Sequence, residues 1–151
     1  MRNHAKHYWL LAAMAALSFM SMYVLMYSMA DRFANVYPSI NQLYMAGLMT
    51  APMILIELLL MRGMYQNRKL NATAGLIALA ALFSFFVLIR RQTAVDDQQF
   101  LKSMIPHHAS AILMCREAAI EDPDIRDLCG RIVSGQQAEI DEMKAKLAEL
   151  E

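Results

Sequence analysis

Methionine and histidine lie together in one short stretch, and this stretch carries the clearest chemical signal in the chain. Met104, His107 and His108 occupy neighbouring turns of a helical pattern, Met114 follows, and Met143 lies in a later segment. Thioether sulfur and imidazole nitrogen suit Cu(I), tolerate Cu(II) and Zn²⁺, and exclude Mg²⁺ and Ca²⁺. Adjacent helical residues point about 100° apart. The two histidines therefore need not share an ion: His108 can pair with Met104, and His107 with Met104 or Met114. The alternative is that these side chains only fill a helical core.

The Met/His stretch belongs to the first of two predicted helices that form an antiparallel hairpin. Between them, Asp122 suits an N-cap and Pro123 the first helical position. We expect the first helix to start in a capping box from Thr93 to Asp96, or to continue directly from the apolar segment before it. The inward stripes are Phe100, Met104, His107, His108, Ala111, Cys115 and Ala118 on the first helix, and Ile125, Cys129, Ile132, Gln136, Ile140, Met143, Leu147 and Leu150 on the second.

A tight turn at residue 122 predicts which residues face each other across the hairpin. Both helices rise about 1.5 Å per residue, so facing residues have numbers that add to about 244. Cys115 and Cys129 meet this condition, and outside the cytoplasm such a pair should form a disulfide. In the cytoplasm they would be two buried thiols or thiolate ligands. The same arithmetic sets the Met/His stretch level with residues 136–140, with Met143 just beyond.

The composition shows that another part of the chain must be solvated by lipid. Of its 151 residues, 58% are apolar and only 19% are charged, which is too apolar for an ordinary soluble domain. The 14 Lys and Arg offset the 14 Asp and Glu, so neither a basic nucleic-acid-binding protein nor an acidic tail is indicated. Neutrality hides a division, because the first 95 residues carry about +6 and the last 56 about −6.

Three segments are long and apolar enough to cross a bilayer, at about residues 8–30, 42–61 and 72–89. We expect residues 1–91 to form a membrane domain and residues 92–151 to form the hairpin. Positive residues are more numerous before the first span and after the second, which predicts a cytoplasmic N-terminus and an external C-terminal domain. An alternative makes the first segment a signal peptide cleaved after Ala30.

The second span carries a ridge of methionines with one acid. The ridge would either pack or bind copper, because thioethers are flexible fillers as well as soft ligands. An acid inside a bilayer costs on the order of 2–3 kcal/mol, so it is protonated and hydrogen-bonded or faces a partner. Its nearest polar candidates at matched depth are Ser18 and Thr73. The ridge comprises Met45, Met49, Met53, Glu57 and Met61.

One pattern resembles a known family. It reads Asp97-x-x-Phe100-x-x-x-Met104-Ile-Pro-His107-His108-x-x-Ala111-Ile-x-Met114, followed by Ile132-x-x-x-Gln136-x-x-Glu139-Ile140-x-x-Met143. Over about residues 96–144 this resembles the DUF305 family of ferritin-like, four-helix, copper-associated proteins. The membrane part, with Asn41-Gln42-x-Tyr44-Met45-Ala46 and Ala51-Pro52-Met53, is similar to a three-span subgroup. The resemblance implies periplasmic copper binding or resistance, with ligands at Met104, His107, His108, Met114 and Met143.

The chain departs from longer proteins of this kind, which carry the Met-x-x-His-His helix twice. Here the helix occurs once, and a hairpin this small buries too little apolar surface alone. We therefore expect an all-α fold in which three transmembrane helices precede an antiparallel hairpin. The hairpin would be half of a ferritin-like four-helix bundle, completed by a homodimer.

These observations favour an integral membrane protein of the bacterial inner membrane that buffers, sequesters or hands on Cu(I). We expect no enzymatic activity, no nucleic-acid partner, and exchange of copper with other envelope proteins. A membrane-anchored interaction module without metal is the alternative. A third reading is an enzyme that oxidises Cu(I), or a di-iron protein. Di-iron sites need Glu-x-x-His, and positions 104 and 105 are Met and Ile.

Overall fold

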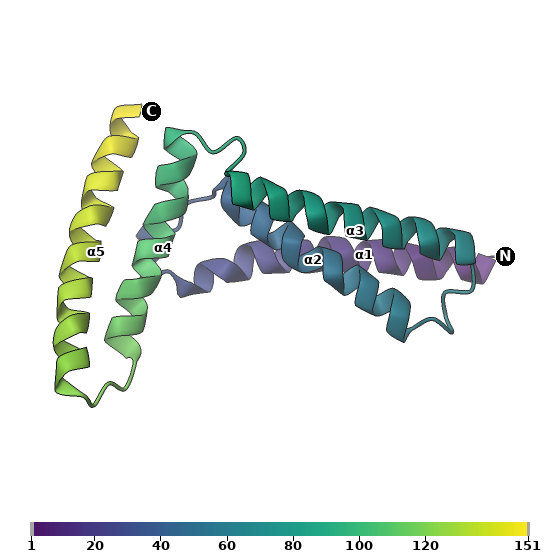
Figure 1. Cartoon of the computed structure of the whole chain (residues 1–151), viewed down its shortest axis with the longest axis horizontal. Helices are drawn as coiled ribbons and strands as arrows, with labels where there is room; N and C mark the ends of the chain where they lie inside the picture. The colour runs from purple at the N-terminus through teal and green to yellow at the C-terminus, as the bar shows by residue number, and fades with distance from the viewer. Residues whose placement is uncertain (1, 151) are drawn as a thin grey trace. The chain divides into compact units, whose positions relative to one another are not determined.

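The computed structural model describes residues 2–150, with side chains from residue 6 onward, and these residues form helices and no strand. The predicted all-α class is thus confirmed. The elements are α1 (Arg2–Leu25), η1 (Met26–Met29), η2 (Phe33–Asn35), α2 (Ile40–Leu60), α3 (Arg68–Arg91), α4 (Asp97–Glu117) and α5 (Pro123–Leu150), where η denotes a short 3₁₀ helix (Figure 1).

The chain divides into two compact units. The membrane unit comprises the chain up to Leu25 together with Gln42–Thr93, and the hairpin unit comprises Met26–Asn41 together with the chain from Ala94 onward. The sequence analysis placed a boundary at residue 91, and the hairpin unit takes up the chain again at Ala94. The prediction missed that the connection between the first two spans belongs with the hairpin.

Three helices of the chain are long and apolar enough to cross a membrane. They cover Lys6–Met29, Ile40–Leu60 and Arg68–Arg91, within a few residues of the predicted segments. Within the membrane unit, Gly47 on α2 lies where an added Cβ would collide with the ring of Phe85 on α3. The absent side chain therefore allows these two helices to approach closely. The buried residues of α2 are Tyr44, Ala46, Gly47, Thr50 and Ala51.

The methionine ridge of α2 lies beside this buried face. Met45, Met49 and Met61 are exposed, while Met53 and Glu57 are half-buried. These residues recur every four positions, so they form a ridge that winds slowly around the helix, away from the residues which contact α1 and α3. The thioethers are therefore not gathered inside the membrane unit.

Glu57 has a partner that the sequence analysis did not identify. The hydroxyl of Tyr65, in the connection between α2 and α3, donates to Oε1 of Glu57 over 3.1 Å. Tyr65 is only 4% exposed, and its carbonyl oxygen accepts from Nδ2 of Asn71 over 2.6 Å. Ser18, one of the two candidates named from the sequence, instead donates to the sulfur of Met14 over 3.5 Å. The connection folds back over the end of α2 and supplies a hydrogen-bond donor. A search among residues at the same depth in the three apolar segments does not find Tyr65, because it lies outside them.

Helix α3 ends at Arg91, and a separate helix, α4, begins at Asp97. Gln92 adopts a left-handed conformation with φ of 49°, and Asp96 caps α4 by accepting from the backbone N–H of Gln99 over 2.8 Å. A helix continuous with the third span and a start at Thr93 are both wrong. Asp96 itself is the N-cap, because its side chain reaches the orphan amide at the third position of the helix.

Helices α4 and α5 run antiparallel, side by side, and are joined by a short turn (Figure 1). Asp122 caps α5 as predicted, because its Oδ1 accepts from the backbone N–H groups of Asp124 and Ile125. The core of the hairpin unit is aliphatic, and its partly buried rim includes Ala30 and Tyr37 from the connection between α1 and α2. The fully buried core residues are Ile105, Ala109, Ile112, Ile140 and Leu147.

The buried stripe of α4 differs from the predicted one. Ile105, Ala109 and Ile112 are fully buried, whereas Phe100 is 51% exposed and His107 is exposed. The reason is that α4 contacts α5 on one side and η1 and η2 on another. Two covered sides shift the most deeply buried residues away from the stripe that faces α5 alone.

Residues 26–41, which we call the docking segment, are held to the hairpin by polar contacts. Asn35 is 1% exposed; its Nδ2 donates to Oδ1 of Asp31 over 2.6 Å, and its Oδ1 accepts from Nζ of Lys144 over 2.6 Å. Arg116 of α4 lies 3.8 Å from the Asp31 carboxylate. Gln99 accepts from the backbone N–H of Ile40 over 2.8 Å. These contacts make the docking segment a third wall of the hairpin unit.

Candidate metal centre

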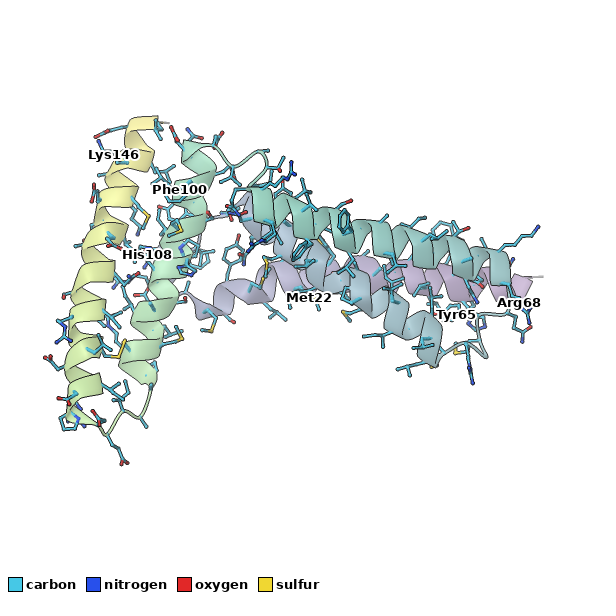
Figure 2. The ribbon with its side chains drawn as sticks, in the orientation of Figure 1. Met22, Tyr65, Arg68, Phe100, His108 and Lys146 are labelled. Carbon is cyan, nitrogen blue, oxygen red and sulfur yellow. A yellow bond between two sulfur atoms is a disulfide. The ribbon has the colours of Figure 1, made fainter. Side chains whose placement is uncertain are left out.

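A histidine of α4 meets a carboxylate of α5 in the middle of the hairpin. Figure 2 labels His108 on α4. Nδ1 of His108 lies 2.9 Å from Oε2 of Glu139, and the histidine side chain is only 13% exposed. The pair is close enough for an ion pair when the ring is protonated, although no hydrogen bond is aligned along the ring N–H. Because Nδ1 faces Glu139, Nε2 is the ring nitrogen left for a ligand.

The contact between His108 and Glu139 fixes the register of the two helices at this level. Met104 lies one turn from His108 on α4, and Met143 lies one turn from Glu139 on α5. Both steps lead toward the open end of the hairpin, because the helices are antiparallel. Residues four apart share a helix face, so Met104 and Met143 occupy facing positions one turn from the histidine. Both methionines are half-buried, and Met143 packs against the aliphatic core.

Burial lowers the pKa of His108 below its usual value. The Glu139 carboxylate acts in the opposite direction and His107 adds a smaller lowering effect. The net direction favours the neutral ring near pH 7, and the neutral imidazole is the form that binds a metal ion.

The other two predicted ligands are not part of this group. His107 is exposed, and its ring centroid lies 6.0 Å from that of His108 with the planes inclined by 57°. Met114 is 53% exposed and lies more than a turn beyond His108 on α4. The structure therefore keeps Met104, His108 and Met143 on the inner part of the hairpin and places His107 and Met114 toward its surface.

Glu139 is the residue that the sequence analysis missed as part of this site. It was visible in the quoted pattern, four residues before Met143, but its role was not assigned. A carboxylate beside the non-ligating nitrogen of a metal-binding histidine orients the ring and raises its basicity. The signal that identifies it is the i, i+4 spacing of Glu139 and Met143, which matches that of Met104 and His108.

Cys115 and Cys129 form a disulfide toward the turn of the hairpin, with their Cα atoms 5.2 Å apart. This is the pairing that equal distance from the turn predicts. The bond closes a sequence separation of 14 residues. It fixes α4 against α5 about two turns from His108.

The donor set at this centre is soft. No group of three His, Cys, Asp or Glu side chains that could hold a metal ion occurs among the described residues. A closed tetrahedral zinc site would need four such ligands. Two thioethers and one imidazole instead match what Cu(I) accepts. Met104, His108 and Met143 therefore fit copper better than zinc or iron.

Comparison with known proteins gives a match over the hairpin and beyond it. The family described as "Domain of unknown function (DUF305)" matches residues 57–147, more than half of the chain. A curated relative, "Uncharacterized protein L153" of Acanthamoeba polyphaga mimivirus, is 33% identical over 122 residues. The matched region covers 80% of this chain and 78% of the relative. No solved structure matches the chain.

Proposed function

Since the chain belongs to the DUF305 family, whose function its description leaves open, we propose a function from the site itself. The protein is an integral membrane copper-binding protein of the bacterial envelope. It buffers, sequesters or hands on Cu(I) through Met104, His108 and Met143. It carries out no bond-making chemistry, because ligand exchange is sufficient for this role.

The observation that carries the proposal is the register at His108 and Glu139. The 2.9 Å contact turns Nδ1 toward the carboxylate and leaves Nε2 as a donor, while facing positions one turn away hold two thioethers. Copper bound here would have the imidazole nitrogen of His108 and the thioether sulfurs of Met104 and Met143 as its ligands. The chain's own contribution is to hold the ring, supply the thioethers, and partly exclude water.

The proposed sidedness places the hairpin outside the cytoplasm, in the periplasm, with the N-terminus inside. The excess of positive residues before the first span and after the second supports this orientation. The disulfide between Cys115 and Cys129 supports it independently, since such bonds persist in oxidising compartments. The docking segment and the hairpin belong to one unit, which agrees with both lying on one side of the membrane.

We also keep the homodimer as part of the proposal. The docking segment covers part of the hairpin, yet large apolar side chains of α4 and α5 remain exposed. A second hairpin packed on them would complete a four-helix bundle. The exposed residues are Phe100, Met114, Ile125, Leu128 and Leu150.

The test is an anaerobic Cu(I) titration of the full-length protein in detergent against a competing chelator. We expect Met104→Leu combined with Met143→Leu to weaken binding by at least about tenfold, and His108→Ala to do the same. Leucine keeps the apolar volume, so the helices should remain intact. Met114→Leu is the matched control, because its thioether is exposed and should not matter.

An alternative function follows if the titration gives no difference. Met143 packs against the aliphatic core, and that contact alone would account for its place. Equal and weak copper binding by wild type and variants would leave a membrane-anchored interaction module. Copper binding lost in Met114→Leu but kept in the double variant would relocate the site to the hairpin surface.

A further inference from the structure

The disulfide lies at the edge of a surface cavity at the turn end of the hairpin. The cavity has a volume of about 370 Å³. Both cysteines are half-buried, so neither sulfur is sealed in the core. Gly130, next to Cys129, has open space where a side chain would stand. The lining includes Cys115, Cys129, Ala118, Arg126, Gly130 and Val133.

The two helices do not depend on the disulfide alone to stay together. The fully buried aliphatic core extends from Ile112 to the open end of the hairpin. Next to Cys115, Arg116 lies 3.8 Å from the carboxylate of Asp31 in the docking segment. Opening the disulfide therefore leaves contacts on either side of Cys115 that hold α4 in place.

We propose that the Cys115–Cys129 disulfide is reducible in the folded protein and that the reduced pair is a second Cu(I) site. The reductant is a dithiol. One thiolate of the dithiol bonds to one cysteine sulfur, the Cys115–Cys129 bond breaks, and the departing thiolate takes up a proton. The second thiol of the reductant then displaces the remaining cysteine sulfur. The dithiol loses two electrons and leaves as a disulfide, and two cysteine thiols are formed.

The reduced pair suits Cu(I) for reasons of ligand number and softness. Thiolate sulfur is the softest donor in proteins, and Cu(I) accepts two such donors without further ligands. The cysteines face each other with Cα atoms 5.2 Å apart, so one ion between the sulfurs can reach both. Zinc would require additional ligands, and no third His, Asp or Glu joins these cysteines among the described residues.

The surroundings also suit the charge of such a site. Binding of Cu(I) releases the two thiol protons and leaves a net charge of about −1 on the ion and its two thiolates. Arg126 lines the same cavity, and its guanidinium also donates to the carbonyl oxygen of Ile120 over 3.1 Å. This fixed cation offsets the charge. Val133 supplies an apolar part of the lining beside the cysteines.

The experiment compares oxidised and dithiol-reduced full-length protein in detergent, both titrated anaerobically with Cu(I) against a chelator. We expect the reduced protein to bind roughly one additional equivalent and to show ultraviolet charge-transfer absorption of Cu(I)–thiolate bonds. Cys115→Ser combined with Cys129→Ser should lose only that equivalent. Met104→Leu combined with Met143→Leu should keep it, which separates this site from the Met/His centre.

Three results would overturn the proposal. The first is equal stoichiometry in the oxidised and reduced wild-type protein. The second is a disulfide that resists the dithiol until the protein is unfolded, measured by thiol alkylation and mass spectrometry. The third is loss of helical circular dichroism on reduction, since the second site requires a folded hairpin. If the serine variant unfolds, Cys129→Ala alone provides the same comparison, because one thiolate cannot form the two-sulfur site.

Discussion

Replacing Asn35 with Ala tests whether the docking segment is a structural wall of the hairpin unit. The side chain is 1% exposed and makes two hydrogen bonds of 2.6 Å, one to the Asp31 carboxylate and one from Lys144. A hydrogen bond to a charged group contributes about 1.5–3 kcal/mol. Lys144 is half-buried and can regain water in the variant, so we expect a combined loss of about 2–4 kcal/mol.

The assay is hydrogen exchange of the full-length protein in detergent, followed by mass spectrometry. Amides of residues 26–41 exchange when the segment detaches, and each 1.4 kcal/mol changes a population about tenfold. Their protection should therefore fall by about 30- to 700-fold. Protection of α1 and α3 in the membrane unit should stay unchanged.

The matched control is Gln137→Ala. Gln137 accepts from an exposed guanidinium N–H of Arg32 over 3.3 Å, so water can replace this bond at little cost. Protection of the docking segment should change by less than about threefold in the control. If Asn35→Ala changes protection no more than the control does, the polar contacts do not hold the segment, and our account of the hairpin unit is wrong.

Three further predictions concern other parts of the chain. Tyr65→Phe removes the donor to Glu57 and should lower the free energy of unfolding by about 1–3 kcal/mol, measured by thermal unfolding in detergent; no loss would show that water or lipid satisfies Glu57. Glu139→Gln removes the charge that raises the pKa of His108. Protons should then displace Cu(I) at a lower pH than in wild type, in titrations carried out downward from about pH 7.5; an unchanged midpoint contradicts the contact. A reporter that works only outside the cytoplasm should be active when it is fused to the C-terminus. Activity of a fused reporter that works only in the cytoplasm would reverse the proposed topology.

Local patterns predicted most of the fold. The three long apolar helices follow from apolar length, because runs of about 20 apolar residues are what a helix needs to be able to cross the hydrocarbon layer. The turn of the hairpin follows from Asp122 and Pro123, whose side chains suit the first positions of a helix. The pairing of Cys115 with Cys129 follows from equal distance to that turn. Each of these signals lies within one or two neighbouring elements.

The features that could not be predicted depend on contacts between distant segments. Asn35 and Lys144 are 109 residues apart, and neither is apolar, so no periodicity links them. The docking segment also explains why His107 was placed wrongly. A helix covered on two sides buries more than one stripe, and periodicity alone does not say which stripe is deeper. The inner position of His108 required the contact with Glu139.

The docking segment also has a consequence for the order in which the protein is made. Residues 26–41 leave the ribosome long before Lys144, so the hairpin unit cannot be completed until Lys144 has been synthesised. Closing so long a loop costs little more entropy than closing a shorter one. During synthesis, however, residues 26–41 have no hairpin to pack against. A fragment that starts at residue 92 lacks this wall. Measurements on such a fragment would report on an incomplete unit.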